Sequence, residues 1–293
     1  MIKLKKLKKI GKKKYLNKKY LLILPILLFN IIFFIGSLFN GISLSFGNEF
    51  YKNGWFLDKN FIFFNEEILN SFTFTLKISL ITTLISLFIS LIGIYFIYNK
   101  PKVKSFFTKI LYLPLLTPYI LIAFFMLYTF STSGFINRLL YRFNIIRNLK
   151  TAPIYINDLN GLGIILGYLW KTIPFVFIIL LNSLETFNNR LLKISESLGA
   201  NERSSFKYII WPHLKKHLFY SGIIVFSFVF SSVEIPLILG PTRPEMLSQW
   251  VYKNFQHGQI VNRSNSFSIA TIILTINILV TVYISNKIKK EQI

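Results

Sequence analysis

Apolar residues gather into six blocks, and each block is long enough to cross a bilayer as an α-helix. A helix that spans the hydrocarbon core needs about 20 largely apolar residues. Prolines lie inside four of the blocks, but neighbouring helices can satisfy the carbonyl groups that a proline frees. The sequence therefore predicts an all-α membrane protein with six transmembrane helices. The blocks run over residues 20–45, 72–98, 110–130, 162–184, 218–239 and 267–285.

The distribution of Lys and Arg predicts how these spans are oriented. With both termini inside, the cytoplasmic segments hold 23 basic residues and the external segments hold 9. Cytoplasmic loops normally carry the excess of positive charge, so both termini are expected in the cytoplasm. The chain then divides into a basic cytoplasmic tail (1–19), a six-helix transmembrane domain (20–286) with a cytoplasmic loop (185–217), and a cytoplasmic C-terminal tail (287–293).

The net charge of +23 raises the question of a nucleic-acid partner. Ten of the 34 basic residues lie in the first nineteen positions, and much of the remainder lies between apolar blocks. Topology and contact with anionic lipid explain this layout. We therefore expect membrane lipid as a partner and no nucleic acid.

No motif of an enzyme is present in the sequence. A Walker A pattern and a Gly-x-Ser-x-Gly elbow are both absent, and the chain has no Cys. The histidines His213, His217 and His257 form no set with metal-ligand spacing. We expect no catalytic, cofactor-binding or metal-binding residues. If transport uses ATP, the nucleotide and its Mg²⁺ must be bound by a partner subunit.

The cytoplasmic loop between the fourth and fifth blocks has the pattern of two short helices separated by a turn. Gly199 suits the left-handed position that follows a helix C-terminus. Asn201 can cap the next helix, and Glu202 lies in its first turn, where the helix dipole favours an acid. Pro212 is expected to break or kink the chain where it re-enters the membrane.

Phe206, Ile209 and Ile210 form an apolar face at helical spacing in the second half of this loop. An amphipathic helix of this kind can insert its apolar face into a groove of a partner. The sequence therefore predicts that this face contacts another protein in the cytoplasm.

The same loop resembles the EAA loop of the permease subunits of ABC importers. That family's pattern is Glu-Ala-Ala, three residues, Gly, and about a dozen residues to an Ile/Val-x-Leu-Pro. Lys193 stands at the motif's Glu position, and Glu196 lies one helical turn further on. The residues that match the pattern are Gly199, Ala200, Phe206, Ile209 and Pro212.

Four further stretches resemble the family in the order in which it places them. Together with the loop they extend the resemblance over roughly residues 20–290, and the last stretch is similar to the spermidine/putrescine branch. The stretches are 70–72 at the start of span two, 134–140 after span three, 170–175 in span four and 233–240 at the end of span five.

The resemblance implies a type I permease in the cytoplasmic (inner) membrane. It implies three protein partners: a second permease copy or paralogue, an ATP-binding cassette ATPase that docks on the loop, and an external solute-binding protein. The expected substrate is a polyamine or a similar small solute. Two alternatives stay open at this point, namely a secondary transporter or channel that does not use ATP, and a membrane scaffold that transports nothing.

Lys171 and Glu234 are ionisable residues inside predicted spans, and such residues are costly in a bilayer. Together with Pro174 of the fourth block, they are our candidates for the substrate path. The Ser and Thr residues of the second block recur at helical spacing and are interpreted as contacts between helices. These residues are Thr75, Ser79, Thr82, Thr83 and Ser86.

Overall fold

The computed structural model describes residues 2–45, 66–146, 148, 155–188, 190–256 and 260–290. These residues form helices and short turns. No strand occurs among them, which confirms the predicted all-α class. A π-helical turn, Phe206–Ile210, joins two of the helices. The α-helices are α1 (Ile2–Ser45), α2 (Glu66–Ile97), α3 (Pro101–Leu116), α4 (Tyr119–Phe130), α5 (Phe135–Arg142), α6 (Leu162–Glu185), α7 (Arg190–Ser197), α8 (Glu202–Ser205), α9 (Trp211–Ser231), α10 (Glu234–Leu239), α11 (Leu247–Gln256) and α12 (Ile260–Lys290).

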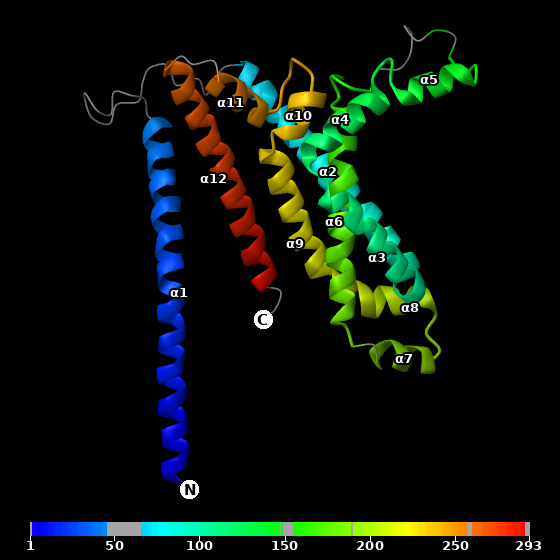
Figure 1. The fold of residues 1–293 in the computed structure, drawn as a ribbon. Helices are drawn as coiled ribbons and strands as arrows, with labels where there is room; N and C mark the ends of the chain where they lie inside the picture. Colours follow the sequence, from blue (N-terminus) through cyan, green and yellow to red (C-terminus); the bar gives the residue numbers. More distant parts are fainter. Residues whose placement is uncertain are drawn as a thin grey trace.

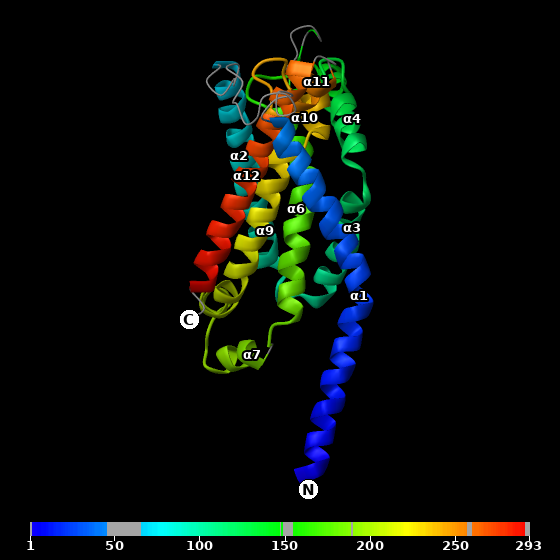
Figure 2. The same cartoon turned by 90° about the vertical axis from the view of Figure 1, so that its left-hand side faces the viewer.

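The long helices form a bundle with two distinct ends. Figure 1 shows α7 and α8 at one end and α4, α5, α10 and α11 at the other. Figures 1 and 2 both place the start of α1 and the end of α12 at the α7 end. The first and last described residues therefore lie at the same end of the bundle as the loop 185–217.

Helix α2 packs on α6 through a buried row of hydroxyl side chains. Ser86 Oγ lies 2.7 Å from Thr172 Oγ1, and Ser90 Oγ donates to the carbonyl of Ile173 at 3.0 Å. Small hydroxyl residues let two helix backbones approach closely in a membrane. The predicted role of the Ser and Thr residues in span two is thus confirmed, because all five are buried.

The third predicted span is divided by a break between α3 and α4. Pro118 has no N–H to donate to the carbonyl of Pro114. The backbone N–H and the hydroxyl of Thr117 donate to that carbonyl instead, at 3.3 and 2.6 Å. The continuous helix expected over 110–130 is therefore replaced by two helices that meet at Thr117.

The fifth predicted span is divided in the same way, which corrects the continuous helix expected over 218–239. Helix α9 ends at Ser231, and α10 begins at Glu234. Pro236 cannot donate to the carbonyl of Ser232, four residues earlier. The hydroxyls of Tyr168 and Ser248 donate to that carbonyl, at 3.3 and 2.7 Å.

Five segments in the described part of the chain are long and apolar enough to cross a membrane. They are Ile23–Ser45, Glu66–Ile97, Tyr119–Arg142, Leu162–Glu185 and Asn265–Asn286. The remaining predicted span corresponds to α9, whose first turns carry Lys215 and Lys216 and are therefore more polar. The count of six spans stays a prediction.

Candidate functional site

The loop between α6 and α9 has the helix–turn–helix structure that its sequence predicts. Helix α7 is followed by the turn at Gly199, and α8, the π-helical turn and α9 then form one helical run from Glu202 to Ser231. Pro212 does not end this run, but the π-helical turn directly precedes it and the run bends between α8 and α9 (Figure 1), so the structure shows the predicted kink rather than a break. Pro212 has no N–H to donate to the carbonyl of Tyr208, four residues earlier.

Gly199 closes α7 with a Schellman motif. Its φ of +81° lies in the left-handed region, which side chains rarely adopt. The N–H of Gly199 donates to the carbonyl of Glu196 at 2.9 Å, and the N–H of Ala200 donates to that of Ser195 at 3.0 Å. No heavy atom lies within 4 Å of the position that a Cβ of Gly199 would occupy. The turn is therefore defined by its own backbone and faces open space.

Two contacts fix α7 and α8 against each other. The side chain of Asn201 accepts a hydrogen bond from the N–H of Ser204 at 2.9 Å, which confirms the predicted N-cap. The hydroxyls of Ser195 and Ser205 lie 3.0 Å apart and are both buried. The loop is thus a folded element rather than a flexible connection.

The apolar face predicted to contact a partner instead packs partly on the chain itself. The ring of Phe206 lies 4.9 Å from that of Tyr95 and 5.6 Å from that of Tyr98, at the end of α2. Ile210 is buried in the main core, and Ile209 is half-buried. Phe206 and Ile210 therefore hold the loop on the bundle, while Phe206 and Ile209 stay partly exposed.

Tyr98 adds a polar contact to this junction. Its hydroxyl donates to the backbone carbonyl of Glu202 at 3.2 Å. Burial raises the pKa of the Tyr98 hydroxyl, and the nearby Glu202 carboxylate raises it further. The hydroxyl therefore keeps its proton and remains a donor to α8.

A different apolar surface of the loop is exposed, and the sequence analysis missed it. Leu191, Ile194 and Leu198 are 48%, 55% and 82% exposed. Their i, i+3, i+7 spacing places them on one side of α7. That spacing was the signal available in the sequence. Lys193 and Glu196, the residues at and near the motif's acidic position, are exposed on the same helix. We call Leu191, Ile194 and Leu198 the α7 stripe.

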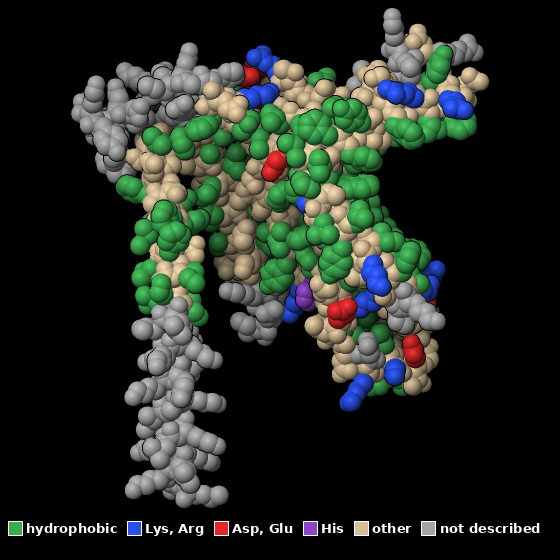
Figure 3. Space-filling model, viewed as in Figure 1, with side chains coloured by type: hydrophobic (Ala, Val, Ile, Leu, Met, Phe, Trp, Pro, Cys, Tyr) green, Lys and Arg blue, Asp and Glu red, His purple; other side chains and the backbone are tan. Residues whose placement is uncertain are grey.

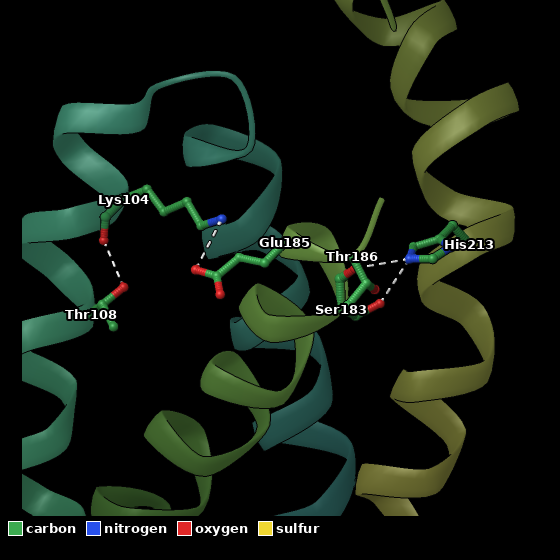
Figure 4. Close-up of polar contacts among 6 residues, drawn as sticks. All are labelled: Lys104, Thr108, Ser183, Glu185, Thr186 and His213. Atoms are coloured by element: carbon green, nitrogen blue, oxygen red, sulfur yellow. Dashed lines mark hydrogen bonds and ion pairs between the residues drawn. The ribbon is translucent and has the colours of Figure 1, made fainter. Parts of the chain in front are cut away.

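Three side chains tie the end of α6 to the start of α9, and we call them the Ser183 clasp. Ser183 Oγ lies 3.0 Å from His213 Nε2 and 2.9 Å from His217 Nδ1. His213 Nε2 also lies 3.0 Å from the carbonyl oxygen of Ser183 (Figure 4). The two histidines are therefore anchored in a contact between helices.

An ion pair at the same level joins α3 to the end of α6. Lys104 Nζ lies 3.6 Å from a carboxylate oxygen of Glu185, the last residue of α6 (Figure 4). The side chain of Glu185 is largely exposed, so the pair contributes little to stability. This ion pair joins α3 to α6, and the Ser183 clasp joins α6 to α9, so the three helices meet at the base of the loop.

The ammonium of Lys171 has its hydrogen-bond acceptor at the break between α3 and α4. Its ammonium donates to the carbonyl of Thr117 at 2.8 Å and lies 4.1 Å from the centre of the Tyr119 ring. The break leaves this carbonyl without a partner in α4, because Leu121 and Ile122 both donate to Pro118. The ammonium of Lys171 therefore supplies the hydrogen bond that the Thr117 carbonyl lacks within α4, and it also makes a cation–π contact with Tyr119.

Glu234 is the first residue of α10, and Pro174 lies about one helical turn after Lys171 on α6. Glu234 is exposed and accepts a hydrogen bond from Ser232 Oγ at 2.6 Å. Helix α10, which begins at Glu234, packs against α4 and α6, the helices that carry Tyr119 and Lys171. No ion pair within 4 Å joins Glu234 to Lys171. Pro174 is buried within the bundle, whereas Lys171 is partly exposed and Glu234 is exposed.

Aromatic rings pack around the contact between Lys171 and Tyr119. The Tyr119 ring stacks on Phe228 with centroids 4.7 Å apart, and Tyr168 approaches both rings edge-on at 6.4 and 6.3 Å. In the part of the chain that the structure describes, no three His, Cys, Asp or Glu side chains gather as metal ligands. His257 lies outside those residues. The arrangement offers a carboxylate, an ammonium and aromatic faces, which are groups that can contact a polar solute.

Residues 86–289 match the family of binding-protein-dependent transport system inner membrane components. This match covers more than half of the 293 residues. The chain belongs to this family. It is accordingly a multi-pass protein of the inner membrane with the type I permease fold of ABC importers, as the sequence predicted. Membership favours this reading over the secondary transporter, the channel and the scaffold, and the family is one of transport subunits rather than enzymes.

Individual relatives agree with this assignment of the permease. The inner membrane ABC transporter permease protein YdcU of Escherichia coli is 28% identical over 186 residues, 60% of this chain and 58% of YdcU. The match thus spans less than two thirds of YdcU. The spermidine/putrescine transport system permease protein PotB of Haemophilus influenzae is 23% identical over 223 residues, 75% of each chain.

A solved structure shares the fold of the permease over almost its whole length. It is a bacterial ABC transporter involved in the import of the acidic polysaccharide alginate. A chain of that transporter superposes with a TM-score of 0.75 at 18% sequence identity, and the match covers 97% of this chain and 99% of the other. At this identity the likeness concerns the fold.

Proposed function

We propose that this permease forms the translocation path of an ATP-driven importer and that a separate ATPase docks on the loop 185–217. The observation that carries the proposal is the α7 stripe: three apolar side chains exposed on a folded loop at one end of the bundle. A groove on the ATPase would bury these side chains, as grooves bury the apolar faces of helices in other complexes.

Contacts at the base of the loop can transmit a movement of the docked ATPase to the membrane-spanning helices. The Ser183 clasp joins α6 to α9, and Phe206 joins the loop to α2. When ATP draws two ATPase subunits together, α7 and α8 move with them, and these contacts pass the displacement to three long helices. The bundle then changes between inward- and outward-facing states, in which packed elements shift as units.

The remaining partners follow from the family. A second permease, either a copy of this chain or a paralogue, supplies the other half of the path. An external binding protein delivers the solute, as the family description implies. ATP and Mg²⁺ bind to the ATPase and not to this chain.

We propose a polyamine or a similar small cation as the solute. The exposed Glu234 carboxylate and the stacked rings of Tyr119 and Phe228 support this choice, because carboxylates and aromatic faces both attract ammonium groups. The likeness to PotB supports it as well. Uptake of labelled putrescine that Glu234→Gln reduces and Glu234→Asp retains would agree with the assignment.

The test of coupling is Gly199→Pro. Proline cannot adopt the φ of +81° that the turn requires, and it lacks the N–H that bonds to Glu196. We expect transport to be lost while the protein level in the membrane stays normal. Gly199→Asn, which tolerates the left-handed region, is the matched control and should retain most activity. Normal uptake by Gly199→Pro at normal protein level would refute the coupling role.

A further inference from the structure

Helix α5 (Phe135–Arg142) projects sideways from the bundle. It lies at the end opposite α7 and runs away from α4 instead of continuing it (Figure 1). Length and composition alone allow Tyr119–Arg142 to be one span. However, the backbone turns between Phe130 and Phe135, and α3 and α4 already provide 28 helical residues for the third span. At about 1.5 Å per residue these residues cross a bilayer without α5.

The corner between α4 and α5 is fixed by hydrogen bonds. The side-chain amide of Asn137 donates to the carbonyls of Ser131 and Thr132 at 3.1 and 3.2 Å, and the N–H of Gly134 donates to Ser131 at 2.8 Å. A Cβ on Gly134 would meet backbone atoms of Thr129 and Ser131 at 2.7 to 2.8 Å, so only glycine fits. The projection of α5 is therefore built into the fold.

The residues of α5 divide into an apolar side and a polar side. At 100° per residue, Phe135, Leu139 and Phe143 fall within an arc of about 80°. They are 64%, 38% and 67% exposed. Arg138 and Arg142 lie at the polar edge of this arc, and Tyr141 lies nearly opposite Leu139. An exposed apolar face of this kind on a fixed helix requires something to cover it.

The direction of the apolar side indicates what covers it. Figure 3 shows hydrophobic side chains along the edge of this projection that faces the α7 end, and basic side chains further from that end. The apolar side thus faces the level of the membrane that the bundle crosses, and the basic side faces away from it. A helix with these two sides lies in the plane of the interface, about 5–10 Å into the boundary between headgroups and acyl chains.

We propose that α5 lies flat in the lipid interface at the end of the bundle opposite the α7 loop. Phe135, Leu139 and Phe143 contact acyl chains, and the guanidinium groups of Arg138 and Arg142 bind lipid phosphates. Guanidinium groups suit this role because their N–H groups match the oxygens of a phosphate. The helix would anchor the third span against tilting when the α7 loop moves at the other end.

Spin labels on single cysteines test this placement, and the chain has no native Cys to remove. Labels at Phe135→Cys and Leu139→Cys, in the purified full chain in liposomes, are compared with a label at Tyr141→Cys. Collisions with oxygen report lipid, and collisions with a water-soluble nickel chelate report water. We expect an oxygen-to-nickel ratio several-fold higher at Phe135 and Leu139 than at Tyr141. Leu84→Cys, exposed on α2, and Leu198→Cys, exposed on the α7 loop, provide the lipid and water references.

Each other outcome contradicts the proposal. Oxygen-to-nickel ratios equal to the water reference at Phe135 and Leu139 would show that the apolar side of α5 faces water. That side would then be a contact surface for a water-soluble protein such as the binding protein. Labels that neither reagent reaches would assign it to a second permease chain. If lipid phosphate holds the polar side, Arg142→Glu lowers the ratio at Leu139 and Arg142→Lys retains it. An unchanged ratio in Arg142→Glu would refute the phosphate contact. None of these readings depends on an ATPase or a substrate.

Discussion

At the scale of single residues, several polar side chains donate to backbone carbonyls where proline interrupts a helix. Lys171 reaches the carbonyl of Thr117, and Tyr168 reaches that of Ser232. Unsatisfied carbonyls inside a membrane are costly, so such contacts hold the broken helices in place. Lys171 was predicted from the sequence as a rare charge in a span. The carbonyl to which its ammonium donates became apparent only in the structure.

Ser183 is the residue whose loss is most informative. Ser183→Ala removes the hydroxyl that both His213 and His217 contact, so α9 is held less firmly to α6. A hydrogen bond contributes roughly 1 kcal/mol, which corresponds to about a fivefold effect. We expect the solute transported per ATP hydrolysed, measured in liposomes that contain the whole transporter, to fall by about that factor.

The Ser183 prediction has a rescue and a control. Ser183→Thr keeps the hydroxyl and should restore the ratio of transport to hydrolysis. Ser231→Ala removes an exposed hydroxyl that bonds only within α9 and should leave the ratio unchanged. The amount of ATPase that co-purifies should stay the same in all three variants. A normal ratio in Ser183→Ala would show that the clasp has no positioning role.

At the scale of elements, the loop 185–217 combines a surface for a partner with a rigid base. Sequence spacing located the turn at Gly199 and the cap at Asn201, because both depend on the conformation of a few adjacent residues. It did not identify which apolar face is free. The packing of Phe206 on α2 decides that, and this contact joins residues far apart in the chain.

The α7 stripe should determine the affinity for the ATPase. Burial of one Leu or Ile side chain contributes about 1.5–3 kcal/mol, so Ile194→Asp or Leu198→Asp should weaken ATPase binding at least tenfold. Co-purification in detergent at a series of salt concentrations measures the effect. Leu159→Asp changes a leucine of similar exposure (69%) away from the loop and is the matched control. Full recovery of the ATPase by both stripe variants would exclude this surface as the docking site.

At the scale of the whole molecule, the two ends of the bundle differ in a way that implies an orientation. The start of α1, the end of α12 and the α7 loop share one end (Figures 1 and 2), and the Lys and Arg counts predict that this end lies in the cytoplasm. Leu198 lies on the α7 loop, and Leu159 lies in the segment before α6, at the other end of that helix.

Cysteine labelling tests this orientation. A membrane-impermeant maleimide added to right-side-out vesicles should react with Leu159→Cys and should spare Leu198→Cys until the vesicles are opened. Both side chains are highly exposed, so access to the reagent depends on the side of the membrane and not on burial. The reverse pattern would place both termini outside and would exclude an ATPase on the α7 loop.

The sequence by itself determined the class of the protein, the approximate location of its spans and the turn at Gly199. These properties follow from the hydropathy and the conformational preferences of neighbouring residues, which no distant contact needs to supply. The tertiary structure decided where prolines divide the spans, which side of the loop is free and which charges meet. Each of these depends on side chains from distant helices that satisfy a carbonyl or cover an apolar face. Helix α5 illustrates both levels, because its amphipathic pattern is local, whereas its position across the end of the bundle comes from the corner that Gly134 and Asn137 build.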